Sequence, residues 1–156
     1  MKAVIATVAA VAALAAAGSA AAQDWRQPAN YGAVTLYSGF TPDPFTVNVV
    51  SGGQIDASAA ISGSCRGWIS NAPDVELTYS AGSLPLIISV SSSVDTTLVI
   101  NGPDGRWYCD DDGGTQGLNP SLRWGSPPSG TYDIWVGSYR RENANATLSI
   151  SELYTY

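Results

Sequence analysis

Short runs of alternating apolar and polar residues follow one another along most of this 156-residue chain. In the run VELTY, for example, Val75, Leu77 and Tyr79 share one face and the polar residues share the other. A period of two is typical of a strand with one buried face. The same pattern, strict or relaxed, predicts further strands at 45–50, 85–90, 96–101, 131–136 and 146–151.

Turn-forming residues separate these runs. Ser51-Gly52-Gly53, Pro103-Asp104-Gly105 and Ser129-Gly130 stand between predicted strands, where glycine and proline allow tight reversals. Many short strands without a helical period indicate an all-β fold, an antiparallel β-sandwich or jelly roll. Residues 24–39 show little periodicity. We therefore expect a loosely packed N-terminal arm at 23–40 and one sandwich domain at 41–156.

The first 22 residues have the composition of a secretory signal peptide. A lysine at position 2 precedes a run of small apolar residues, and the segment ends in Ala20-Ala21-Ala22. The apolar run is too short and too rich in alanine for a comfortable membrane span, which needs roughly 20 apolar residues. We expect cleavage after Ala22 and a secreted or periplasmic protein of a Gram-negative bacterium, with no membrane span.

The charge of the remaining chain is strongly negative. After Lys2 the only basic residues are six arginines, against 13 acidic residues. Nucleic acids and anionic lipids both require basic patches, so neither is an expected partner. An acidic surface suits a metal cation, or simply keeps the protein soluble.

The chain has two cysteines, Cys65 and Cys109. In an exported protein a pair of cysteines predicts a disulfide, and the alternative is two buried thiols. A bridge between them would close a loop of roughly 44 residues and stabilise the fold by about 4 kcal/mol in the chain-entropy treatment.

Several classes of catalysis lack their residues. The chain contains no histidine, and its only lysine is Lys2. A Ser-His-Asp triad, histidine-containing zinc sites and Schiff-base chemistry are therefore excluded. A hydrolase needs only two carboxylates. The pairs Asp74/Glu76 and Asp110/Asp112 keep that alternative open, although we expect no enzyme.

Three consecutive aspartates, 110–112, follow Cys109 and precede Gly113-Gly114. Calcium binds carboxylate, amide and backbone oxygens, and glycine lets the backbone fold closely around an ion. The alternative is a solvated acidic loop. Asp104 is a nearby candidate in the hairpin turn. The predicted calcium ligands are Asp95, Asp110, Asp111, Asp112 and Asn119.

Tryptophans are numerous for a chain of this size. An outward-facing tryptophan can stack on a sugar ring or on a partner's side chain. In the run TYDIWV, Asp133 and Trp135 share the face opposite Tyr132. The candidates for ligand stacking are Trp107, Trp124 and Trp135, and the alternative is that these side chains belong to the core.

The segment DTTLVINGPDGRWYCDDDGG, with NPSLRW, SGTYDIWVGSY and NATLSISE after it, resembles the bacterial pre-peptidase C-terminal domain over residues 95–152. The upstream part resembles small exported alphaproteobacterial proteins, some of which have serine-peptidase names. In larger proteins such a domain follows a peptidase, whereas here we expect no catalytic domain before it.

The resemblance implies a β-sandwich, often stabilised by calcium, with a non-catalytic accessory role. It also implies Asp95 and the aspartates 110–112 as acidic positions of the family. The expected partner is an unknown protein or glycan, for example an exported peptidase. Two alternatives stay open: a lectin-like domain that binds carbohydrate or cell envelope, and an inhibitor or chaperone associated with a peptidase.

Overall fold

The computed structural model describes residues 23–156, so the predicted signal peptide at 1–22 lies outside the described residues. These residues form eleven strands and one short helix. No helix among them has the length and hydropathy that a membrane crossing requires. The elements are β1 (Ala33–Tyr37), β2 (Phe45–Ser51), β3 (Ile55–Asp56), α1 (Ala57–Ala60), β4 (Trp68–Ile69), β5 (Val75–Ser80), β6 (Leu86–Ser92), β7 (Thr96–Asn101), β8 (Trp107–Asp110), β9 (Ser121–Trp124), β10 (Gly130–Ser138) and β11 (Ala144–Ser151).

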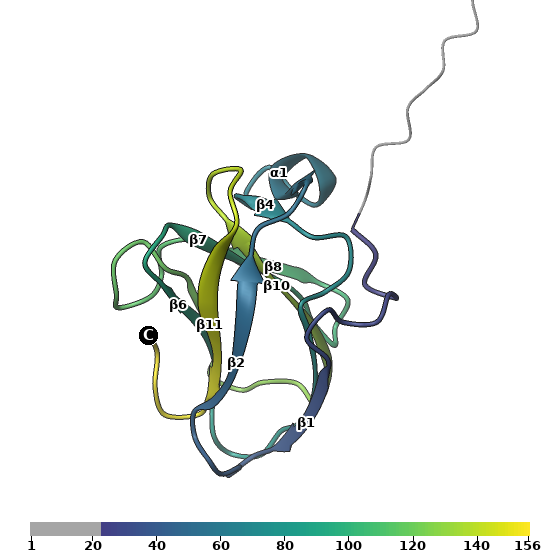
Figure 1. Cartoon of the computed structure of the whole chain (residues 1–156). Coiled ribbons are helices and arrows are strands. Elements are labelled where there is room, and N and C mark those ends of the chain that lie inside the picture. Colours follow the sequence, from purple (N-terminus) through teal and green to yellow (C-terminus); the bar gives the residue numbers. More distant parts are fainter. Residues whose placement is uncertain (1–22) are drawn as a thin grey trace, which may run out of the picture.

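The strands form two sheets that pack face to face, as the sequence predicts (Figure 1). In sheet A the long strand β10 pairs with β5 and β4 along one edge and with β7 along the other. Strand β1 extends this sheet beyond β5, β8 extends it beyond β7, and β3 pairs with β4. Sheet B has the order β2-β11-β6-β9. All pairs are antiparallel except β1 with β5.

The main core lies between the sheets and follows from the alternation in the sequence. On β5 the apolar positions of VELTY point inward, and on β10 Tyr132, Ile134 and Val136 do the same. From sheet B they meet Ile88, Leu148 and other branched residues, all fully buried. Each such side chain contributes roughly 1.5–3 kcal/mol when it leaves water.

The N-terminal segment is more ordered than the sequence suggests. Residues 33–37, expected in a loosely packed arm, form β1 and pair with β5 in parallel. Leu36 and Phe40 of this segment are buried in the main core. The sandwich therefore begins inside the predicted arm, because two apolar side chains at its end find space between the sheets.

A second, smaller core covers part of the outer face of sheet A. The predicted disulfide between Cys65 and Cys109 is present, with the two Cα atoms 5.2 Å apart. It ties the segment that contains α1 to strand β8, over Val99 and Trp135. Figure 1 shows α1 and β4 at one end of the sandwich, with β1 near the other end. Only part of the outer face of sheet A is thus covered.

Candidate functional site

Asp110, the first aspartate of the acidic loop, has a structural role. It ends β8, where it pairs with Leu98 of β7. Its Oδ2 accepts hydrogen bonds from the backbone N–H of Gly113 at 2.7 Å and of Ser121 at 2.8 Å. One carboxylate oxygen therefore closes the loop and joins sheet A to β9 of sheet B.

Asn119 is also occupied by the fold. Its Oδ1 accepts a hydrogen bond of 2.6 Å from the hydroxyl of Thr96, and its amide nitrogen donates to the carbonyls of Ser92 and Gln116, both at 3.0 Å. The side chain is buried, with 4% exposed. All its polar atoms hold loop 116–119 against the start of β7, so we do not retain it as a metal ligand.

Asp95 is different, because part of its carboxyl group has no partner. The residue lines a cavity of about 280 Å³ between residues 92–95 and 116–119. Its Oδ1 is buried and makes no hydrogen bond. Burial raises the pKa of this carboxyl group above its usual range, and the negative charges of Asp112 and Asp111 raise it further. A cation beside Asp95 would relieve both effects.

The structure therefore divides the five predicted ligands. Asp95, Asp111 and Asp112 are close enough to influence one another electrostatically, whereas Asp110 and Asn119 serve the backbone. Within residues 23–156, no three acidic or cysteine side chains come close enough to share one ion. Any ion here would need backbone or water oxygens as well. Asp104, the further candidate, binds the hydroxyl of Tyr108 at 2.7 Å in its own turn.

The three tryptophans expected to stack on a ligand do not form an exposed row. Trp135 is fully buried in the second core, and the ring of Trp107 lies 5.4 Å from it. Trp124 makes edge-to-face contacts with Tyr108 and Tyr132 and packs against the main core. The prediction of an accessible stacking face on Trp135 is wrong, because the disulfide-linked segment covers that face of the sheet.

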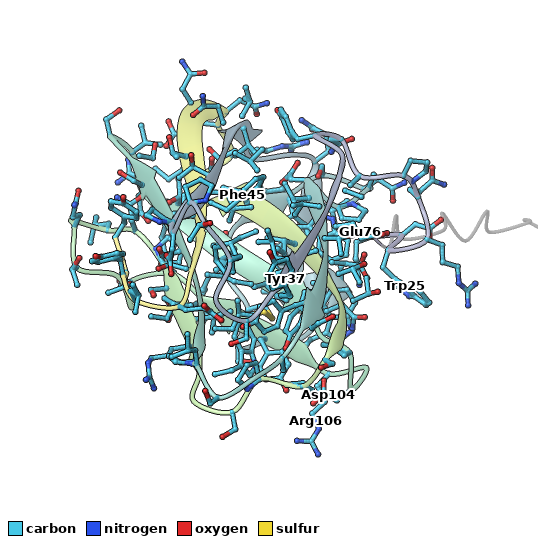
Figure 2. All side chains as sticks on the ribbon, turned by 90° about the horizontal axis from the view of Figure 1, so that it is seen from below. Trp25, Tyr37, Phe45, Glu76, Asp104 and Arg106 are labelled. Carbon is cyan, nitrogen blue, oxygen red and sulfur yellow. A yellow bond between two sulfur atoms is a disulfide. The ribbon has the colours of Figure 1, made fainter. Side chains whose placement is uncertain are left out.

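A second candidate site lies on the uncovered part of the same face. Asp133 on β10 is the direct cross-strand neighbour of Glu76 on β5 and of Asn101 on β7. We call these two acids, together with the amide of Asn101, the carboxylate row. They line a cavity of about 590 Å³ together with Trp25. Figure 2 shows Glu76 and Trp25 on the same side of the molecule. The sequence indicated that Asp133 faces away from the main core, but it did not reveal its neighbours.

Asp133 is the most unusual member of the row. Only 5% of the residue is exposed. Burial raises the pKa of its carboxyl group to about 6, and the negative charge of Glu76 acts in the same direction. Like charges directly opposite on adjacent strands destabilise a sheet, so the row is suited to a positively charged ligand.

Comparison with known proteins adds the following. No model of a protein family matches the sequence, and no curated protein matches it. One similar solved structure is the pre-peptidase C-terminal domain of a collagenase from Bacillus anthracis, with a TM-score of 0.47, 14% identity, and coverage of 80% of this chain and 98% of that domain. Another is a periplasmic inhibitor of g-type lysozyme from Aeromonas hydrophila, with a TM-score of 0.42, 13% identity, and coverage of 76% and 96%. The first belongs to the family that residues 95–152 resemble.

Proposed function

We propose that this chain is a non-catalytic binding module that works outside the cytoplasm and whose acidic loop is ordered by calcium. The observation that supports the calcium site is the carboxyl group of Asp95. One of its oxygens is buried without a hydrogen-bond partner, and the charges of Asp111 and Asp112 lie nearby. A bound cation would provide a partner for that oxygen and offset the repulsion among the three carboxylates.

The proposed carboxylate ligands are Asp95 and Asp112, with Asp111 beside them as an additional negative charge and Asp110 as the residue that fixes the loop. Calcium commonly completes a shell of roughly six to eight oxygens with backbone carbonyls and water. Gly113 and Gly114 leave the loop backbone without side chains at the point where it follows the aspartates. When bound, the ion would supply charge compensation to the loop and no reaction step.

The hydrogen bonds made by the two candidate carboxylate pairs support a non-catalytic role. In the pair Asp74/Glu76, both oxygens of Asp74 are engaged, Oδ2 by the backbone N–H of Val136 at 2.8 Å and Oδ1 by Asn30 at 3.2 Å. In the pair Asp110/Asp112, Asp110 holds the loop. Each pair thus contains a residue whose carboxylate stabilises the backbone. The absence of histidine from the whole sequence removes the usual base at neutral pH.

The disulfide supports the proposed location, because such bridges persist in oxidising compartments. The proposed partner is an exported protein, and the sequence resemblance suggests a peptidase. Pull-down with the mature chain from a periplasmic extract tests this partner. A lectin-like role has less support, because Trp107, Trp124 and Trp135 pack within the fold.

Thermal unfolding of the mature, disulfide-bonded protein tests the calcium site. At about 100 times the dissociation constant, calcium adds roughly 2.7 kcal/mol to the free energy of unfolding, a rise of several degrees in Tm. The rise is the difference between the Tm in calcium and the Tm in chelator. We expect it to disappear in Asp95→Asn and in the double variant Asp111→Asn, Asp112→Asn. Glu76→Gln removes the same charge at a different site and should keep the full rise. An unchanged wild-type Tm in calcium, or a full rise in Asp95→Asn, would overturn the proposal.

A further inference from the structure

The outer face of sheet A has two halves with opposite chemistry. In one half, Trp135, Val99 and Cys109 are cross-strand neighbours, and the disulfide-linked segment covers them. Two residues earlier on β10, Asp133 is the neighbour of Glu76 on one side and of Asn101 on the other. Direct cross-strand neighbours point to the same face of a sheet. The carboxylate row therefore lies beside the covered half, on the same face.

Neither acid of the row has a partner of opposite charge. Among residues 23–156, the one salt bridge joins Arg106 to Asp104, and no hydrogen bond contributes to the pKa of Asp133. Yet Asp133 is 95% buried, since only 5% of it is exposed. A largely buried carboxylate without a hydrogen-bond donor or a cation destabilises the fold. The oxygens of Asp133 are not among the fully buried polar atoms, and the residue lines the cavity. A cation in the cavity would reduce this cost.

The space above the row is large enough for an organic group. The cavity has a volume of about 590 Å³, far more than one ion occupies. Its wall includes the basic residue Arg26 as well as apolar, hydroxyl-bearing and aromatic residues, chiefly Trp25, Pro103, Ser129, Gly130 and Thr131. Trp25 is 46% exposed, and the guanidinium of Arg26 lies 4.9 Å from the centre of its ring. The ring thus already has a cation stacked on it, which is the contact an aromatic side chain offers to a guanidinium or ammonium.

We propose that this cavity binds the cationic end of an organic ligand, a guanidinium or primary ammonium group, with Asp133 and Glu76 as the charged partners and Asn101 as an additional acceptor. Trp25 lies at the rim, where it would pack against the ligand's stem or stack on its charge. The ligand is either a small free cation or an arginine or lysine side chain of a protein. This site is separate from the proposed calcium loop and does not depend on it.

A divalent metal fits the cavity less well than an organic cation. Calcium requires roughly six to eight oxygens at short distance, and the row supplies three oxygen-bearing side chains. In addition, the described acids form no cluster of three. A bidentate guanidinium, in contrast, matches two neighbouring carboxylates with few other contacts.

The experiment is an NMR titration of the ¹⁵N-labelled mature protein with N-acetyl-L-arginine amide. We expect saturable shifts of the amides of β5 and β10 around Glu76 and Asp133 and of the indole N–H of Trp25. N-acetyl-L-glutamine amide, which is neutral, should cause no saturable shift. Asp133→Asn and Glu76→Gln should each weaken binding by about tenfold or more. Asp111→Asn removes one charge in the acidic loop and should bind as the wild type does.

A second arm distinguishes the source of the cation. If acetyl-Gly-Arg-Gly amide binds more tightly than the single amide, the site reads a basic side chain within a peptide; equal affinities indicate a small free cation, and both results support the proposal. Three results would overturn it: no saturable shift up to about 10 mM of either cation, equal binding of the neutral amide, or calcium producing the same shifts. Hydrolysis of a nitrophenyl glycoside, lost in Asp133→Asn, would make the acid pair catalytic instead and would also overturn it.

Discussion

The hydroxyl of Tyr79 donates a hydrogen bond of 2.6 Å to Oε1 of Glu152, and both side chains are buried. The other oxygen of Glu152 accepts from the backbone N–H of Gly39 at 2.7 Å. The carboxylate therefore links the end of β11 to β5 and to the segment after β1. Burial, and then the hydrogen bond to Glu152, raise the pKa of Tyr79 to about 12.

Removing this hydroxyl should weaken the fold. We expect Tyr79→Phe to lower the free energy of unfolding by about 1–3 kcal/mol, because Glu152 loses a donor in a buried position. Urea unfolding measures the loss, and ultraviolet titration should show that a tyrosine with a pKa of about 12 has disappeared. Tyr37→Phe is the matched control, since Tyr37 is 66% exposed. Equal stabilities of the two variants would contradict the assigned role of the bond.

The pH dependence of stability should reveal the buried carboxylic acids. Asp133 has a pKa of about 6 in the folded protein, raised from 3.8 by burial and by Glu76. The folded state therefore holds this proton more tightly than the unfolded state, so the stability that it contributes below pH 4 is lost as the pH rises through 6. Asp74, whose pKa burial also raises to about 6, adds a loss of the same sign.

Asp133→Asn isolates one part of this effect. The variant should be more stable than the wild type at pH 7.5, by about 1–3 kcal/mol, and should lose less stability between pH 5 and 7.5. Urea unfolding in chelator at the two pH values measures both differences. Asp74 remains in the variant, so some decline should persist. A wild-type stability that increases over this range would refute the assignment.

Asp110 separates the structure of the acidic loop from its proposed calcium site. We expect Asp110→Asn to lower the free energy of unfolding by about 1–3 kcal/mol in chelator, since the backbone N–H groups of Gly113 and Ser121 lose an ionised acceptor. The rise of Tm in calcium should remain. If the rise disappears while the Tm in chelator is unchanged, Asp110 is a ligand rather than a structural residue.

Removal of the disulfide should expose the second core. Cys65→Ser with Cys109→Ser should lower the free energy of unfolding by about 4 kcal/mol, because the unfolded chain is then no longer restricted by the closed loop. Hydrogen exchange should increase in residues 55–69, which contain α1 and β4, before it increases in β11. The reduced wild-type protein is the control and should behave as the variant does. Uniform exchange across both sheets would show that the bridge supports the whole sandwich instead.

The sequence predicts the strands well, because alternation is a local property. Five of the six runs chosen by their period of two lie within strands of the structure, and the sixth, 85–90, begins one residue before β6 at Leu86. None of these runs covers the short strands β1, β3, β4, β8 and β9. Strand β1, for example, depends on parallel pairing with β5, about 40 positions away in the chain. The cysteine count and the expected export together were enough to predict the disulfide, because two cysteines allow only one pairing.

The candidate sites were predicted less completely, for physical reasons. Asp110 accepts a hydrogen bond from the backbone N–H of Ser121 because the chain brings Ser121 back beside β8. The spacing of residues in the sequence does not predict this return. The pairing of Asp133 with Glu76 depends on the register of two strands that are distant in the sequence. Alternation does place both acids on the faces of their strands that point away from the main core. Comparison of these outward faces on the two strands could therefore have identified the row as a candidate site.

The two halves of the outer face of sheet A also differ in how accessible their tryptophans are to a fluorescence quencher. Trp25 stands over the open half and is 46% exposed, whereas Trp135 in the covered half is fully buried. A water-soluble quencher should therefore reach the fluorescence of Trp25 in the native protein and that of Trp135 only after the disulfide-linked segment has lifted. In a variant in which Trp68, Trp107 and Trp124 are replaced, Trp25 and Trp135 are the remaining fluorophores. Weaker quenching then reports a ligand that shields Trp25, and stronger quenching after reduction reports the exposure of Trp135.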